Sequence, residues 1–127
     1  MSKYVIDSQA WVEYLQGSPR GASVEHIINN RVNELHVSPI IIAEVLSVIK
    51  RKGLNPDMAL AALRVAKVFP IDEALAIEAG LLHAELRKTV KNFALADAFI
   101  AVTAKRLAAK IVTGDFHFKE FSNAVMI

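Results

Sequence analysis

The chain has 127 residues, which is the size of one ordinary domain, so we expect a single domain over residues 1–127. A hydrophobic content of 54% with 22% charged residues is typical of a packed protein and excludes a disordered one. The absence of cysteine excludes disulfides, thiolate metal sites and cysteine nucleophiles.

A net charge of +2 is too small to indicate a nucleic-acid partner. No apolar run reaches the roughly 18 residues that a membrane span needs, and there is no signal pattern, so we expect a cytoplasmic protein without a membrane partner.

Short apolar runs alternate with helical segments in the first half of the chain. Residues 4–6 form an apolar run that is too short for a helix and predicts a buried strand. A helix is predicted over residues 9–15, because Gly17 and Pro19 follow it as turn residues. The other elements predicted for this half are a helix over residues 23–30, a strand over residues 35–38 and a helix over residues 40–52.

The second half of the chain continues this alternation. Asn55 and Pro56 are typical of a helix start, and the helix is predicted to reach residue 67. Asp72 is predicted to cap a further helix. The remaining elements are a strand over 68–71, helices over 73–88 and 94–109, a strand over 111–113 and an edge strand over 124–127. This order favours an α/β domain of three layers, in which helices cover both faces of a central, mostly parallel sheet.

Four of the 13 acidic residues stand where a surface charge is not expected. Asp7 ends the first predicted strand, and Asp115 follows the strand over residues 111–113. Glu44 and Asp97 lie inside apolar helical segments, although Asp97 could also be an ordinary first-turn charge on its helix. Most of the other acids lie at helix starts or on amphipathic faces. Glu78 also has apolar neighbours, but we interpret its face as solvated.

These four carboxylates predict a metal site. The carboxyl ends of parallel strands meet at one edge of the sheet, where α/β proteins place their sites. If Glu44 and Asp97 lean toward Asp7 and Asp115, four like charges converge, and only protonation or a cation relieves their repulsion. The segments that carry them contain no Lys or Arg in a suitable position, so a divalent metal is expected. Ligation by oxygen alone favours Mg²⁺, with Mn²⁺ as a plausible substitute.

The same segments carry a family resemblance. In chain order, residues 4–8 (YVIDS), 38–45 (SPIIIAEV), 95–101 (LADAFIA) and 112–118 (VTGDFHF) are similar to the motif blocks of PIN-domain proteins. The resemblance covers essentially the whole chain, and it is greatest to the VapC-like branch, the toxin ribonucleases of bacterial and archaeal toxin–antitoxin pairs. It implies a three-layer α/β/α PIN-like domain and a Mg²⁺-dependent hydrolase that cleaves RNA phosphodiester bonds with a metal-activated water.

The resemblance also implies roles for particular residues. Position by position, it makes Asp7 and Asp97 the direct metal ligands, and Glu44 and Asp115 ligands that act directly or through water. Ser8 and Thr113 match the supporting polar residues of the family. His117 departs from the pattern, because many members carry a further Asp there. The number of metal ions that the site holds, one or two, therefore remains open. His117 is either a supporting group or a loop residue at the mouth of the site.

Partners follow from the resemblance and from local charge. The family implies an RNA substrate, a homodimer or dimer-based oligomer and, for toxins, an antitoxin protein. The apolar Trp11, Val12 and Leu15, and the apolar helix pairs between Ile40 and Val68, offer surface for association, unless they belong to the core. Local basic groups are candidate RNA phosphate contacts, although cations are also common at helix ends. These are Arg51, Lys52, Arg87, Lys88 and Lys91.

Other functions fit parts of the same pattern. An RNA-processing or quality-control nuclease without an antitoxin would use the same four acids. A non-catalytic module that binds RNA or protein would not need all of them. A phosphatase on a doubly wound sheet also uses strand-end aspartates, but it usually has a second Asp close after the first, and Asp7 is followed by Ser8 and Gln9.

Overall fold

The computed structural model, which describes residues 2–127, contains a five-stranded parallel sheet in the order β3-β2-β1-β4-β5. Its strands are β1 (Lys3–Ile6), β2 (Glu34–Val37), β3 (Lys67–Val68), β4 (Lys110–Thr113) and β5 (Ala124–Met126). The first strand is therefore central, with β2 and β4 as its two neighbours. The strand order reverses at β1, so the carboxyl ends of β1 and β4 lie at a topological switch point, where open α/β sheets place their sites.

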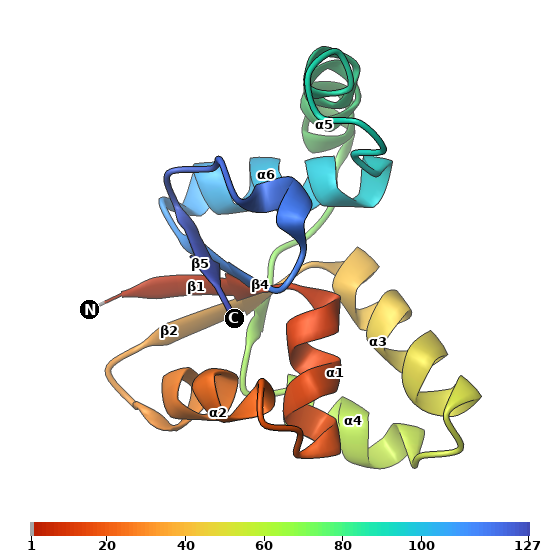
Figure 1. Ribbon diagram of the computed structural model, residues 1–127, viewed down its shortest axis with the longest axis vertical. Helices are drawn as coiled ribbons and strands as arrows, with labels where there is room; N and C mark the ends of the chain where they lie inside the picture. Colours follow the sequence, from red (N-terminus) through yellow and green to blue (C-terminus); the bar gives the residue numbers. More distant parts are fainter. Residues whose placement is uncertain (1) are drawn as a thin grey trace.

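Helices lie on both faces of this sheet (Figure 1), which confirms the predicted three-layer α/β/α architecture. The helices α1 and α2 lie on one face, beside α3 and α4, and α6 lies on the other face with α5 packed outside it (Figure 1). Their bounds are α1 (Ser8–Gln16), α2 (Gly21–Asn29), α3 (Pro39–Arg51), α4 (Pro56–Leu63), α5 (Glu73–Leu86) and α6 (Leu95–Leu107), with a short 3₁₀ helix η1 (Phe116–Phe118) after β4. No helix of residues 2–127 is long and apolar enough to cross a membrane.

Side-chain caps fix where several helices begin. Ser38 accepts a hydrogen bond from the Ile40 amide (3.3 Å) at the start of α3, and Asn55 accepts one from the Asp57 amide (2.9 Å) at the start of α4. Such caps satisfy amides that have no partner within the helix. Asp7 does the same for α1, so the last residue after β1 both ends the strand and starts the helix.

The segment between α4 and α5 differs from the prediction. The helix predicted to reach residue 67 ends at Leu63, because the next three amides form tight turns that return the chain to the sheet. The strand predicted over residues 68–71 is the two-residue β3, and Val68 is 56% exposed rather than buried. Pro70 has no amide with which to extend the pairing, and β3 is an edge strand, where short pairing is common.

Three of the apolar residues predicted to offer surface for association lie in or against the core. Trp11 is fully buried and Val12 is 6% exposed, so neither offers surface for association. Leu15 is half-buried and packs against the same core.

The end of α6 also differs from the prediction. This helix ends at Leu107, two residues earlier than predicted, because Ala108 takes the left-handed conformation (φ 53°) that ends a helix.

We expect Gly21→Ala to destabilise the protein by about 1–3 kcal/mol, because a Cβ atom there would overlap the backbone of α1. It would lie 2.7 Å from the Glu13 carbonyl carbon and 2.9 Å from the Tyr14 Cα atom, and neither atom can move alone. Urea denaturation measures the effect. The matched control is Gly80→Ala in α5, where a Cβ atom has no neighbour within 4 Å and should stabilise the helix by about 0.5–1 kcal/mol. Equal free energies of unfolding for the two variants would contradict the close approach of α1 and α2.

Candidate metal centre

The central strands bring two of the four acids together. Ile6 of β1 pairs with Val112 of β4, and the Asp7 amide donates a hydrogen bond to the Val112 carbonyl (2.8 Å). Asp7 therefore lies beside the end of β4, where the chain continues to Asp115. This neighbourhood follows from strand order alone, as expected for a switch point in a parallel sheet.

Thr113 connects these two acids. Its hydroxyl donates a hydrogen bond to Asp7 Oδ2 (2.8 Å) and accepts one from the Asp115 amide (3.0 Å). The Ser8 amide donates to the other oxygen, Asp7 Oδ1 (2.7 Å). Asp7 and Thr113 are both buried, so the Asp7 carboxylate is fixed through both of its oxygens. Structural support of this kind is what a metal ligand needs to keep its orientation.

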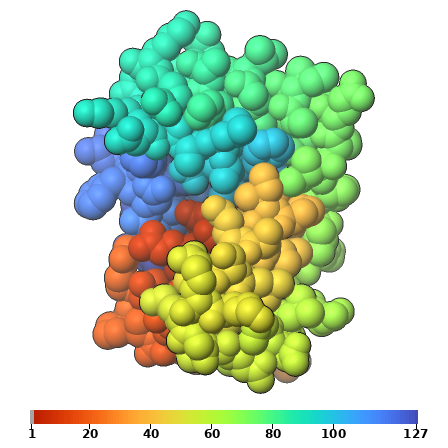
Figure 2. Space-filling model, turned by 90° about the vertical axis from the view of Figure 1, so that its right-hand side faces the viewer, coloured from red at the N-terminus to blue at the C-terminus, as the bar shows by residue number. Residues whose placement is uncertain are grey.

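The other two acids reach the same place from helices. Glu44 lies in α3, and Asp97 lies in the first turn of α6, where it is 9% exposed. Figure 2 shows the face on which the segments meet: the start of α1 in red, α3 in orange to yellow, α6 in cyan and the segment after β4 in blue. The structure therefore brings all four predicted acids to one edge of the sheet.

Burial first, and then repulsion by neighbouring acids, raises the pKa of Asp7, Glu44 and Asp97. Burial, followed by the charges of Asp7 and Asp115 and then that of Glu44, raises the pKa of Asp97 to about 7. Burial and then the Asp7 charge raise the pKa of Glu44. Burial also raises the pKa of Asp7, although the hydrogen bonds from Thr113 and Ser8 oppose this. Among residues 2–127, no Lys or Arg forms an ion pair with any of the four carboxylates.

His117 also faces this cluster. Its Nδ1 atom lies 3.2 Å from Asp115 Oδ1 and 4.0 Å from Asp97 Oδ2, and its backbone amide donates to Asp115 Oδ1 (2.9 Å). The ring packs edge-on against Phe93, with 6.4 Å between the ring centroids. A ring nitrogen of His117 and one carboxylate oxygen each from Asp97 and Asp115 lie within 4.8 Å of one another. His117 therefore lies in the site itself, and not merely in a loop at its mouth.

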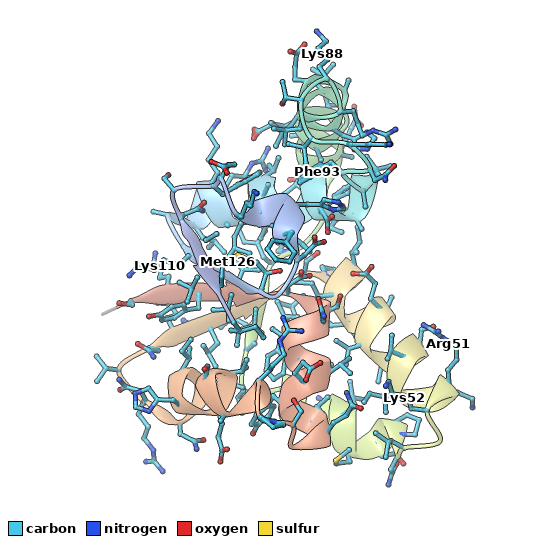
Figure 3. All side chains as sticks on the ribbon, in the orientation of Figure 1. Arg51, Lys52, Lys88, Phe93, Lys110 and Met126 are labelled. Atoms are coloured by element: carbon cyan, nitrogen blue, oxygen red, sulfur yellow. The ribbon has the colours of Figure 1, made fainter. Side chains whose placement is uncertain are left out.

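The predicted basic residues occupy two separate places. Arg51 lines a shallow pocket together with Ser8 and Glu44, and Lys52 lines the adjoining pocket between α1 and α3. In Figure 3, Arg51 and Lys52 lie at the end of α3, whereas Lys88 lies at the opposite extreme of the molecule, beyond α5. Lys88 also pairs with Glu85 (3.1 Å). The structure therefore brings Arg51, and not Lys88, into the same pocket as a site carboxylate.

Glu78 stays outside the site, but its environment differs from the one predicted. Its Oε1 lies 3.6 Å from Arg106 Nη2, so it forms an ion pair between α5 and α6. Its face is therefore partly covered by a neighbouring helix and is not a simple solvated one.

Arg20 is a residue near the site that the sequence did not indicate. A Cβ atom at position 114 would overlap the Arg20 guanidinium, so this cation packs directly over Gly114, next to Asp115. Arg20 Nη2 also donates to the carbonyl of Ile127 (3.2 Å). Arg20 lies in the turn between α1 and α2, far from residue 114 in sequence, and no local pattern predicts such a contact.

The chain matches one known protein family over most of its length. The model of the PIN domain matches residues 4–124, which is nearly the whole chain. The chain belongs to the PIN-domain family. No curated protein matches its sequence.

Solved structures with this PIN fold include toxin components. The chain superposes on a toxin–antitoxin complex from Klebsiella pneumoniae with a TM-score of 0.76 at 19% identity, covering 97% of this chain and 96% of that one. It superposes on FitAcB from Neisseria gonorrhoeae with a TM-score of 0.73 at 22% identity, covering 98% and 96%. For VapC20 from Mycobacterium tuberculosis, described as a sarcin-ricin loop cleaving toxin, the TM-score is 0.72 at 16% identity, covering 94% and 97%. These neighbours share the fold of this chain.

We expect the metal-free protein to lose stability as pH rises from about 4 to about 7. Asp97 has a folded pKa of about 7, above its ordinary value of 3.8, so the folded state holds this proton more tightly than the unfolded state does. One such proton contributes a slope of up to about 1.4 kcal/mol per pH unit in this window. In Asp97→Asn the slope should be clearly smaller. Urea denaturation in EDTA at several pH values measures it, with the exposed Glu25→Gln as control. Equal slopes in the wild type and Asp97→Asn would refute the coupling.

Proposed function

We propose that this protein is a metal-dependent ribonuclease, a VapC-like toxin of a toxin–antitoxin pair, that hydrolyses RNA phosphodiester bonds with Mg²⁺. One observation carries the proposal: four carboxylates converge at the switch point of the sheet without a Lys or Arg ion pair among residues 2–127. An arrangement that repels itself in this way has little value for stability. It suits a site that binds a cation.

The donor atoms fit a hard divalent cation. Asp7 and Asp97 are the most buried of the four acids, and we assign them as direct ligands. Glu44 and Asp115 are half-buried and would hold the ion directly or through water. The His117 Nδ1 atom is buried without a hydrogen-bond partner in residues 2–127, which fits a position beside a bound cation. Carboxylate oxygens favour Mg²⁺, and Mn²⁺ is the natural substitute.

Each side chain has a separate task in the proposed hydrolysis. A bound divalent cation acidifies a water molecule and offsets charge on the attacked phosphate. Thr113 and the Ser8 amide hold Asp7 by both oxygens, which keeps this ligand in place. The uncompensated charge of the four acids repels an RNA phosphate, so productive binding of substrate depends on the cation. No acid of the cluster needs to act alone as a general base.

A basic residue beside the site and the structural neighbours support RNA as the substrate and the proposed protein partners. Arg51 shares a pocket with Glu44 and is placed to contact a phosphate beside the site. VapC20, described as a toxin that cleaves the sarcin-ricin loop, has the same fold. Several neighbours are toxin–antitoxin complexes, and some of them contain DNA. We therefore propose an antitoxin partner and a homodimer or dimer-based oligomer for this chain.

Asp97→Asn tests the nuclease directly. We expect the purified variant to lose RNA cleavage in Mg²⁺ by about 100-fold or more, because it removes one charge of the metal site. EDTA should abolish cleavage by the wild type, and Mn²⁺ should restore it. The variant should remain folded, since removing one of several repelling charges does not weaken the core.

Glu25→Gln is the matched control for this experiment, because it removes an acid from the exposed face of α2 and should cleave normally. Cleavage by Asp97→Asn at the wild-type rate would refute the assigned site. If the wild type binds RNA without cleaving it in any divalent cation, a non-catalytic binding module is the better description. Co-purification with the product of an adjacent small gene distinguishes a toxin from a processing nuclease.

Arg51→Ala should lower the affinity for RNA and make that affinity less sensitive to salt. Removing one phosphate contact reduces the slope of log affinity against log salt by about 0.7 for a single strand. Filter binding in the Asp97→Asn background measures this without cleavage. Arg31→Ala is the control, because Arg31 precedes the start of β2 and so lies at the opposite edge of the sheet from the site. An unchanged slope for Arg51→Ala would exclude Arg51 from the RNA contacts.

A further inference from the structure

The four acids provide no hydrogen-bond partner for the His117 imidazole. Its Nδ1 atom is buried, yet it has no hydrogen-bond partner within residues 2–127. Asp115 Oδ1 lies 3.2 Å away, but the pair does not meet the geometry of a hydrogen bond. Buried ring nitrogens normally have a partner, because removing one from water without a replacement costs about 1–3 kcal/mol. An atom that could bind both the nitrogen and the oxygens is the simplest partner.

The distances around Nδ1 suit a shared cation. Ligand atoms about 2.1 Å from one octahedral ion lie about 3.0 Å apart when adjacent and about 4.2 Å apart when opposite. The Nδ1 atom lies 3.2 Å from Asp115 Oδ1 and 4.0 Å from Asp97 Oδ2, which falls within this range. These three atoms come from three separate positions of the chain, and all three side chains are at least partly buried.

The surrounding contacts fix the ring in this position. The His117 amide is held by Asp115 Oδ1 (2.9 Å), and the imidazole packs edge-on against Phe93. Phe93 is itself fully buried between Phe118 and Phe121, with centroid separations of 5.7 Å and 6.0 Å. Figure 3 shows Phe93 at the junction of α5, α6 and the segment after β4. A ring held on one side by a rigid aromatic cluster presents its nitrogen to the acids without further ordering.

We propose that His117 is a metal ligand through Nδ1, together with Asp97 and Asp115, and that this nitrogen shifts the site from Mg²⁺ toward transition-metal ions such as Mn²⁺. The inference rests on the proposed metal site and adds a ligand to it. Mg²⁺ strongly prefers oxygen, whereas ions later in the first transition row bind imidazole increasingly well. The position at which the family often has an acid thus sets metal preference in this chain.

Electron spin echo spectroscopy of bound Mn²⁺ tests this ligand without measuring activity. We expect ¹⁴N modulation from a directly bound imidazole in the wild type, and its loss in His117→Asn and His117→Asp. Labelling histidine with ¹⁵N should change the modulation in the wild type. His26→Asn, on the exposed face of α2, should keep it. Titration should show Mn²⁺ affinity about 10- to 100-fold weaker in His117→Asn. In His117→Asp the ratio of Mn²⁺ to Mg²⁺ affinity should fall about tenfold, because an oxygen replaces the nitrogen.

The outcomes separate this inference from the proposed function. Mn²⁺ that binds to the wild type without ¹⁴N modulation would exclude His117 as a ligand and leave the carboxylate site standing. Modulation that persists in His117→Asn would assign the nitrogen to another residue. A wild type that binds no Mn²⁺ at all would overturn both the ligand and the metal site. The wild-type spectrum is decisive by itself, so the test holds even if one variant folds poorly.

Discussion

Repulsion between carboxylates at one edge of the sheet is the constraint on which the rest of this structure depends. Parallel pairing of β1 with β4 sets Asp7 beside the segment that leads to Asp115, and two helices add Glu44 and Asp97. Burial, and then the charges of the neighbouring acids, raises the pKa of Asp97 to about 7. The fold tolerates this because the core beneath is continuous and because Thr113 and Ser8 fix Asp7 at short range. Stability is thus reduced at the one place where we propose that a cation binds.

The elements around the site hold side chains in position more than they add charge. The aromatic cluster of Phe93, Phe118 and Phe121 supports the short 3₁₀ helix that carries His117. Arg20 approaches from the other side and covers Gly114, where any larger residue would displace it. Neither Arg20 nor Arg51 forms an ion pair with the four acids within residues 2–127. A cation that paired tightly there would compete with the proposed metal, so we propose that the arginines contact substrate phosphates instead.

The sequence predicted the parts of this site that depend on local pattern. Asp7 and Asp115 follow short apolar runs, and strand ends in a parallel sheet converge. Glu44 and Asp97 were detectable because charge is rare among apolar helical neighbours. Arg20 and the environment of His117 depend on contacts between distant segments, for which a single sequence has no signal. The strand over residues 68–71 was misjudged for a related reason: an apolar run predicts burial, but only strand order shows that β3 is an edge.

The structural neighbours show how little of the sequence the fold requires. Chains that share 16–22% identity with this one superpose on it with TM-scores of 0.72 to 0.76. A core can exchange many apolar residues if volume and pattern are kept, so the backbone persists while the side chains change. Function does not follow from the backbone, since one fold carries different sites. In this chain the proposed chemistry therefore depends on a few side chains from α3, α6 and the ends of β1 and β4. His117 is among them, because a nitrogen ligand there would change the metal preference while leaving the fold intact.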